Sequence, residues 1–504
     1  MGQTITIPGL SKTTKSPGFK GAVSLGTGAL NQGGLVRRLL VVGNKTSDGS
    51  LTADTEILRV QSEDEVDEIC GPGSELALMA YKSLLYEGVE VWVAAVAEAG
   101  GAAAAGATIT FTGTSTAAGS LYVRIGGYQI EYSYASGVTA AAAATALTAK
   151  INAATRCAVG ATASTADVVL ATKSKSARMN NLAVYIDQKD MGSGLTAAVT
   201  GGSALPSKGA QTGCRFTGGS GADSAANIIT ILKNENFDTV AVPHVDSTNM
   251  ARWKAHFADI AQVGKQKHQA YVAGQNLTYS TAQAISYTTL NDGYGQVVHI
   301  EDCENLGAEI AASAAGLRQL KDSEHPNQSF FGEVLLGIAP LVNSSSNPND
   351  SEIETSLTNG LTPCITQDGE VVLIESITTR CHDGDDNFDD RCWRTGEART
   401  AFRIFEGIGL IYTSEFSVEN PWVGPDLPDG KSPPEKKATP SLWKSRITAY
   451  LREKEAEFWI IDVDNNLPSV TYDATFKGLL AQLNLEVHPV QNKTGVWVRQ
   501  QASS

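Results

Sequence analysis

Helix and strand patterns alternate regularly between residues 223 and 320, and this alternation constrains the fold more than any other feature of the sequence. Each crossover helix must pack back onto its sheet through a right-handed connection, so such an alternation builds a parallel sheet flanked by helices. The successive segments are AANIITILKNENF, TVAVPH, STNMARWKAHFADIAQVGKQ, QAYVAG, STAQAISYTTL, GQVVHIED and LGAEIAASAAGLRQL. The sequence therefore predicts an α/β core.

A further β-α-β unit is predicted near the N-terminus. LVRRLLVVG and VEVWVAAVA read as buried strands, and SELALMAYKSLLYEG between them reads as a helix. Ser62 with Glu65 predicts a capping box, and Ser74 predicts a second helix N-cap.

The composition changes between about residue 100 and Pro206, where Ala, Gly, Thr and Ser dominate and charges are few. The strand patterns there are short: ATITFTG, SLYVRIGGYQIEYSY, DVVLATKS, NLAVYIDQ and GLTAAVTG. One helical stretch, TAAAAATALTAKINAAT, begins after the N-cap Thr139 and is rich in Ala, the best helix former. We expect an inserted, mostly β domain whose helix covers one face of a small sheet.

The remaining chain contains a predicted helix, SEIETSLTNG, and a hairpin, TPCITQDGEVVLIESIT, whose Asp368-Gly369 pair suits a tight turn with positive φ angles. Two long helical patterns follow, RTAFRIFEGIGLIYTSEF and TPSLWKSRITAYLREKEAEFWI, and the chain closes with the strand patterns LNLEVHPVQ and GVWVRQQ.

The 504 residues predict roughly three or four packed units. The expected parts are an N-terminal arm (1–20), the first part of the core (21–99), the inserted domain (100–209), the α/β core (210–380), a helical or mixed domain (381–482) and a C-terminal strand and arm (483–504).

Charge and cysteine usage argue against several classes of protein. The formal net charge of -15 repels phosphate backbones, so nucleic-acid binding is not expected. The seven cysteines are scattered and lack the paired spacings of zinc sites or disulfide frameworks, which suits a reducing compartment. The N-terminal segment lacks a signal-peptide core and no run of some 18 apolar residues occurs, so neither secretion through a signal nor membrane insertion is expected.

No catalytic or phosphate-binding motif is complete. A Ser/His/Asp triad needs a nucleophile on a sharp turn, yet no G-x-S-x-G occurs, and His244 and His299 at predicted strand ends are interpreted as structural. The Gly-rich segments 26–28 and 218–221 lack the strand-to-helix context of a phosphate cradle and are interpreted as flexible loops.

Two acidic segments carry enough oxygen atoms for a calcium ion. The first holds Asp383, Asp385, Asp386, Asp389 and Asp390, and the second spans residues 462–466. Both lack the Gly at the sixth position of a calcium loop, so solvated loop charge is the preferred interpretation. No HExxH motif is present. The sequence thus predicts no catalytic residue, cofactor or metal site.

Three stretches, taken in their order, resemble the tail sheath proteins of contractile-tailed phages, especially those of the Mu-like kind. They are CGPGSELALMAY (70–81), LTNGLTPCITQDGEVVLIESITTR (357–380) and FKGLLAQLNLEVHPVQNKTGVWVRQ (476–500). The VTGGS that ends the insertion and the following NFDTVAVPHVDS look similar to that family as well. The acidic segment CHDGDDNFDDRC (381–392) departs from the family's pattern.

The resemblance implies an α/β core, sometimes described as subtilisin-like, with an insertion displayed on the outside of the tail and arms that join the sheets of neighbouring copies. It also implies a location in the virion tail after assembly in the host cytoplasm. The implied partners are identical subunits in hexameric rings and a helical stack, the tail tube protein, and the baseplate and tail terminator proteins.

The run Val496-Trp497-Val498-Arg499 alternates like a half-buried strand. It could be the last strand of its own domain or a strand donated to a neighbour's sheet. The resemblance, with the polar spacer 491–495, favours donation by β-augmentation. The predicted subunit-interface residues are Ile5, Thr6, Ile7, Val496, Trp497, Val498 and Arg499.

The function predicted from these observations is that of a structural sheath subunit, not an enzyme. It polymerises around the tail tube and contracts to drive the tube through the host envelope. Two alternatives remain open: an α/β hydrolase or nucleotide-binding enzyme with an accessory β domain, which the 223–320 alternation permits, and a surface-display or adhesin-like assembly protein.

Overall fold

The computed structural model of the chain describes residues 38–489, apart from 263–264, 384, 386, 390–392, 417–421 and 429–436. The chain divides into two compact units. The larger unit includes residues 33–324 and 332–395, and the smaller one includes 325–331 and the chain from Gly396 onward. Each unit is described by itself below.

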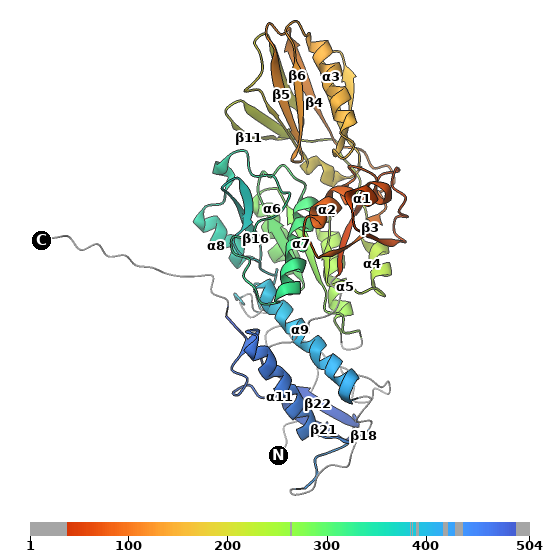
Figure 1. The fold of residues 1–504 in the computed structure, drawn as a ribbon, viewed down its shortest axis with the longest axis vertical. Coiled ribbons are helices and arrows are strands. Elements are labelled where there is room, and N and C mark those ends of the chain that lie inside the picture. Colours follow the sequence, from red (N-terminus) through yellow and green to blue (C-terminus); the bar gives the residue numbers. More distant parts are fainter. Residues whose placement is uncertain are drawn as a thin grey trace, which may run out of the picture. The chain divides into compact units, whose positions relative to one another are not determined.

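An eight-stranded sheet forms the centre of the larger unit, in the order β2-β3-β1-β13-β14-β15-β16-β17. Its strands β3 and β16 are labelled in Figure 1. Its inner strands run parallel, and the edge strands β2 and β17 are antiparallel to their neighbours. The parallel sheet predicted from the alternation is therefore confirmed. The strands are β1 (Arg38–Asn44), β2 (Ile57–Val60), β3 (Glu90–Val96), β13 (Thr239–Ala241), β14 (Ala270–Gln275), β15 (Gly295–His299), β16 (Thr362–Gln367) and β17 (Glu370–Leu373).

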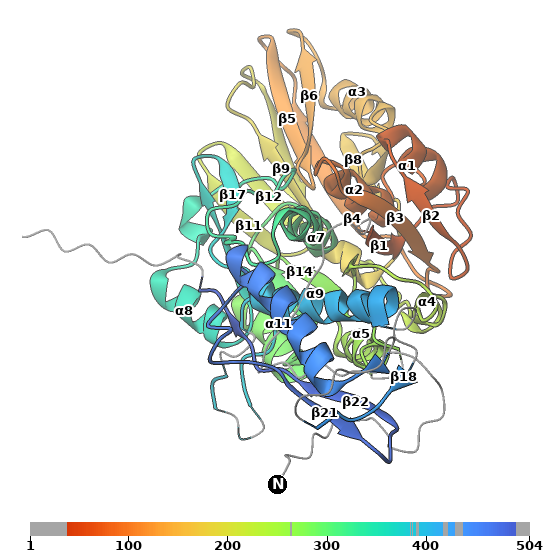
Figure 2. The ribbon, with the colours of Figure 1, turned by 60° about the horizontal axis from the view of Figure 1, so that its bottom comes forward.

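Helices cover both faces of this sheet because neighbouring residues of a strand point to opposite sides. Leu40 and Val42 of β1 join a buried cluster with Trp253 and Phe257 on one face, while Gly43 lies against Leu76 on the other. Figure 2 shows α7 over β14 on that second face. The first face carries α4 (Ala226–Leu232), α5 (Ser247–Ile260) and η2 (Ala284–Leu290), and η2 directly follows α6 (Tyr279–Gln283). The second face carries α2 (Glu75–Leu84) and α7 (Gly307–Glu324). Helix α1 (Glu63–Cys70) lies beside α2.

Local signals in the sequence set the element ends. Ser74 Oγ accepts a hydrogen bond from the Ala77 N–H, as predicted for an N-cap. Ser62 caps α1 through the Glu65 N–H, but the Glu65 carboxylate accepts from the Gln61 N–H, one residue before the position that a capping box requires. The box is therefore only half formed.

The predicted hairpin is confirmed by β16 and β17, which pair from Cys364 opposite Leu373 to Gln367 opposite Glu370. Its turn residues have φ angles of 52° and 85° at Asp368 and Gly369, the positive values that the Asp-Gly pair predicts. The helix expected before the hairpin is α8 (Asp350–Thr358), which follows the short η3 (Ser344–Ser346).

Residues 106–215, here called the β insertion, form two antiparallel sheets rather than the one small sheet expected. Their orders are β10-β4-β8-β7 and β11-β12-β9-β5-β6, and Phe111 of one sheet packs edge-on against Tyr132 of the other. The predicted helix α3 (Ala140–Ala153) begins after its N-cap Thr139 and packs against strands of both sheets. The other elements are β4 (Gly106–Gly113), β5 (Gly119–Ile125), β6 (Tyr128–Tyr134), β7 (Val159–Ser164), β8 (Asp167–Thr172), η1 (Ala177–Asn181), β9 (Ala183–Asp187), β10 (Leu195–Thr200), β11 (Ala204–Lys208) and β12 (Gln211–Arg215).

The smaller unit is built on the two long helices predicted from the sequence, α9 (Thr395–Ile411) and α11 (Pro440–Ala456). Their apolar faces share a buried cluster that includes Ile404, Trp443 and Ile447. The last described strand, β23 (Glu486–Val487), is short and pairs with β20. The remaining elements are η4 (Tyr412–Phe416), β18 (Trp422–Val423), β19 (Lys437–Ala438), β20 (Ile460–Ile461), β21 (Ser469–Asp473) and β22 (Gly478–Gln482). Among the described helices, none has both the length and the apolar character that crossing a bilayer requires.

Candidate functional site

The strand order of the main sheet reverses between β1 and β13. From β1 the chain continues to β3 on one side, whereas β13 to β16 are added on the other side. In open α/β sheets, ligands bind at such a switch point, in the crevice outside the carboxyl ends of the strands. Here β1 ends at Asn44, and Pro243 and His244 follow β13. This crevice is the candidate functional site.

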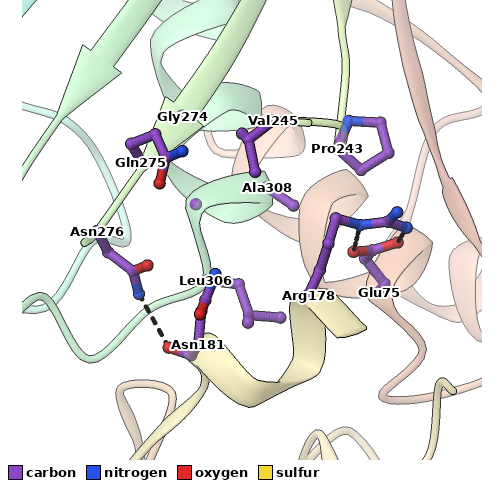
Figure 3. Close-up of a pocket in the computed structure, with 11 residues that line it drawn as sticks. Glu75, Arg178, Asn181, Pro243, Val245, Gly274, Gln275, Asn276, Leu306 and Ala308 are labelled. Carbon is purple, nitrogen blue, oxygen red and sulfur yellow. Dashed lines mark hydrogen bonds and ion pairs between the residues drawn. The ribbon is translucent and has the colours of Figure 1, made fainter. Parts of the chain in front are cut away.

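Arg178 of the β insertion occupies the crevice (Figure 3). Its Nε and Nη2 donate to the two oxygens of Glu75, at 3.0 and 2.7 Å. Nη1 donates to Asp223 Oδ1, and Nη2 also lies 3.0 Å from Asp223 Oδ2 and 2.8 Å from Asn44 Oδ1. A planar guanidinium suits this arrangement because its N–H groups form a fork that matches carboxylates. These four residues are called the Arg178 cluster below.

Asn44 ties the Arg178 cluster to the sheet. Its backbone N–H donates to Glu75 Oε2 (3.0 Å), and its Nδ2 donates to Asp223 Oδ2 and to the Val96 carbonyl at the end of β3 (both 3.0 Å). Glu75 itself is the first residue of α2, where the helix dipole favours a carboxylate. One network thus joins two strands, a helix and the β insertion.

Burial and charge compete within the Arg178 cluster. The side chain of Glu75 is 1% exposed and that of Arg178 is 14% exposed. Burial acts to lower the pKa of Arg178, but the charges and hydrogen bonds of Glu75 and Asp223 outweigh it and raise that pKa. Burial acts to raise the pKa of Asp223, but Arg178 brings it below its usual value. The arginine and this aspartate therefore remain ionised at neutral pH.

His244 lies beside the cluster and is fully buried. Trp253 Nε1 donates to its Nδ1 (3.3 Å), which assigns the proton of the neutral ring to Nε2, 3.6 Å from Asp223 Oδ1. Burial lowers the pKa of His244 to about 4, so the ring is neutral at pH 7. The other histidine considered from the sequence, His299, is also buried, with Nε2 2.6 Å from the Leu277 carbonyl oxygen.

The crevice is filled by the protein's own atoms. A Cβ at Gly274 would lie 2.1 Å from the Gly307 carbonyl oxygen, so the start of α7 touches the backbone of β14. Asn276 closes another side by donating from Nδ2 to the Asn181 carbonyl (3.0 Å; Figure 3). The cavity that remains is about 10 Å³, which is room for roughly one water molecule.

The Gly-rich segment 218–221, predicted to be a flexible loop, is instead held by backbone pairing. Ser220 and Ala103 exchange two hydrogen bonds of 3.1 Å, and the Gly219 N–H donates to Asn180 Oδ1 (2.8 Å). The other Gly-rich segment, 26–28, lies outside the described residues.

The acidic segments engage their carboxylates in local contacts. Asp383 Oδ1 accepts from the N–H groups of Asp385 and Asn387, at 2.9 and 3.0 Å. Asp389 is buried and paired with Arg380 at 3.0 Å, which corrects the expectation of solvated charge at that position. In the second segment, Asp462 accepts from Asn465 Nδ2 (2.6 Å). Asp386 and Asp390 are outside the described part, within which no group of three or more His, Cys, Asp or Glu is arranged to hold a metal ion.

Neither terminal segment predicted to form a subunit interface is described by the structure. This applies to Ile5, Thr6, Ile7, Val496, Trp497, Val498 and Arg499. Sequence reasoning also missed the Arg178 cluster. A usable signal was present, because the β insertion is poor in charge and Arg178 is one of its four arginines.

Comparison with known proteins found no matching family profile and no matching curated protein. Among solved structures, the chain is similar to the sheath tail protein from Desulfitobacterium hafniense, with 13% identity and a TM-score of 0.48, covering 95% of this chain and 100% of that one. It is also similar to the helical sheath of the anti-feeding prophage in the contracted state, with 11% identity and a TM-score of 0.45, covering 99% of each chain. Both are sheath proteins.

Proposed function

We propose that this chain is a structural subunit of a contractile tail sheath. It polymerises as stacked rings around a tail tube, and contraction drives the tube through the host envelope. Its proposed partners are identical copies, the tube protein, and the baseplate and tail terminator proteins, and its proposed location is the virion tail. The α/β sheet corresponds in this proposal to the subtilisin-like core, and the β insertion to the part displayed on the outside.

The proposal is supported by the positions that the motifs resembling the sheath family occupy in the fold. Motif 70–81 supplies the capped start of α2 and with it Glu75 of the Arg178 cluster. The motif NFDTVAVPHVDS supplies β13, the buried His244, and Asp246, which caps α5. These motifs build packing and buried polar contacts, which is the use that a structural subunit makes of its sequence.

The motif at residues 357–380 is used in the same way. It forms the end of α8 and the hairpin of β16 and β17 at one edge of the main sheet. Segment 332–335 runs along the outer side of β17, where the Gly332 and Leu335 N–H groups donate to Leu373 and Val371 (2.9 and 2.8 Å). The chain therefore covers this edge of its own sheet.

The proposed mechanism requires cores that move between two packings while staying connected. The extended packing is held kinetically and the contracted one is lower in free energy, so no nucleotide is needed. The terminal arms provide the connection by adding strands to neighbouring sheets. With about four to six main-chain hydrogen bonds of roughly 0.5 to 1.5 kcal/mol each, one arm contributes several kcal/mol per junction.

Negative-stain electron microscopy of the purified full-length chain tests this function. Long helical tubes are expected, because the proposed interfaces are heterologous and continue from copy to copy. Uniform small particles with hydrolase activity would support the enzyme alternative and contradict the sheath proposal. Heat-denatured protein serves as the control that distinguishes tubes from aggregates.

A further inference from the structure

All four arginines of the β insertion contact groups on the α/β core. Arg124 pairs with Glu304 at 2.8 Å, and Arg215 donates from Nη2 to the Asn276 carbonyl at 2.6 Å. Arg156 reaches α1, where it pairs with Glu63 and with Asp64 and Asp67, both at 2.8 Å. Arg178 is the fourth. The seam between insertion and core is therefore bridged repeatedly by guanidinium groups.

Arg178 and Arg156 differ in their exposure to solvent. The Arg156 side chain is 32% exposed and its partner Asp64 is 95% exposed, so water and salt screen much of that attraction. The partners of Arg178 are nearly inaccessible. Removing one side of a buried pair leaves an uncompensated charge in the interior, which is strongly destabilising.

We propose that Glu75, Asp223 and Asn44 form a guanidinium-binding site on the core, and that Arg178 fills it as an internal ligand that latches the β insertion in place. This inference goes beyond the proposed sheath function, because it concerns the folded single chain and its tests need no assembly. Insertion and core then behave as one rigid body as long as the latch is closed.

The geometry explains why the ligand is a guanidinium ion and not simply a cation. Nε, Nη1 and Nη2 of Arg178 each donate to an acceptor of the site, and Glu75 receives two parallel bonds. An ammonium group is a compact charge with three donors and cannot span two carboxylates that face different edges of the fork. The site thus selects for planar shape as well as for charge.

Hydrogen exchange of the full-length chain carrying Arg178→Ala tests the latch. We expect amides of η1 and of segment 216–224 to exchange roughly a hundredfold faster, because a buried ion pair is broken. The amides of β14 and β15 in the main sheet serve as an internal reference. Arg156→Ala is the matched control, since it removes a guanidinium from the same seam at an exposed position, and its effect should stay within about threefold.

Rescue by a free ion tests the binding site. Millimolar guanidinium chloride should restore slow exchange in Arg178→Ala, whereas sodium chloride at the same concentration should not. Adding Glu75→Gln to Arg178→Ala should abolish this rescue, because the bidentate acceptor is lost. If the amides of Arg178→Ala exchange at the same rates as those of the unmodified chain, Arg178 does not latch the β insertion. If they exchange fast but guanidinium chloride slows them no more than sodium chloride does, the core has no guanidinium-binding site.

If the alanine variant does not fold, the same hydrogen-exchange measurement can be made on Arg178→Lys. Lysine retains a buried cation, so the carboxylates are not left without a counter-charge, but it removes the fork. We expect a folded chain in which η1 and segment 216–224 exchange at least about tenfold faster than in the unmodified protein. Exchange equal to that of the unmodified protein would overturn the proposal.

Discussion

At the scale of single residues, several titratable groups are buried deeply enough to change their protonation. His256 on α5 is buried between Trp253 and Phe257, and neither of its ring nitrogens has a hydrogen-bond partner within the described part of the chain. Burial lowers its pKa to about 4, although nearby Asp259 acts in the opposite direction. In the unfolded chain the same ring titrates near pH 6.5.

This difference makes the stability of the larger unit depend on pH. Between pH 6.5 and 4 the unfolded state binds a proton at His256 that the folded state does not bind, so the free energy of unfolding falls as the pH falls. His256→Phe removes this contribution. The free energy of unfolding should fall between pH 7 and pH 4 in both proteins. We expect this fall to be smaller in the variant than in the unmodified chain, by up to about 3 kcal/mol.

Urea unfolding followed by tryptophan fluorescence at a series of pH values measures the effect. Phenylalanine suits the site because the surroundings are aromatic and the His256 ring nitrogens form no hydrogen bond with any residue that the structure describes. A pH dependence identical in variant and unmodified protein would show that His256 does not contribute.

At the scale of elements, the backbones of β14 and α7 lie so close together that neither has room for a side chain at the point of contact. A Cβ at Gly274 would meet the Gly307 carbonyl oxygen at 2.1 Å, and one at Gly307 would meet the Gly274 oxygen at 2.3 Å. The obstacle at both positions is main chain, which cannot rotate away as a side chain can. Glycine is therefore required by space at these two positions and not by an unusual φ angle.

Gly274→Ala should lower stability by about 1 to 3 kcal/mol or more, because the added methyl pushes α7 away from the sheet. Gly100→Ala is the matched control, since no atom of the described residues lies within 4 Å of the added carbon and the φ angle of Gly100 is not positive. Differential scanning calorimetry of both variants measures the difference. Equal melting temperatures would contradict the predicted contact.

The two N-cap serines permit a second comparison at this scale. Ser74 is buried, and its hydroxyl accepts from the Ala77 N–H at 3.1 Å, whereas Ser62 is exposed and its bond to the Glu65 N–H is 3.3 Å long. We expect Ser74→Ala to lower the free energy of unfolding by about 1 to 2 kcal/mol and Ser62→Ala to lower it by about 0.5 kcal/mol. The difference arises because water can replace the lost acceptor only at the exposed N-terminus of α1. Chemical denaturation of the two variants should give this order.

At the scale of the whole molecule, the proposed function depends on the terminal segments. The alternating run Val496 to Arg499 follows a polar spacer, residues 491–495, and we expect this spacer to let the run extend to a neighbouring copy. If that run completes a neighbour's sheet, removing it changes assembly and leaves the fold of each copy intact.

Deleting the residues after Asn492 should therefore yield folded monomers that no longer form tubes. Circular dichroism and thermal unfolding should match those of the full-length chain, while electron microscopy and size-exclusion chromatography should show single subunits. A charge-reversing change at Lys493, within the spacer, is the control and should still assemble. Normal tubes from the truncated chain would refute strand donation.

The sequence by itself determined most elements of this protein, because their signals are local. Alternating patterns fixed the strands and helices of the main sheet, Ser74 and Thr139 fixed two helix starts, and Asp368-Gly369 fixed a turn through its positive φ angles. The Arg178 cluster was decided only by the tertiary structure. Its arginine lies 45 residues from Asp223, 103 from Glu75 and 134 from Asn44, so no spacing along the chain relates them. These charges come together only because the strand order reverses at the switch point and the β insertion packs against the core there. Since the charges are buried, leaving one of them unpaired would be strongly destabilising.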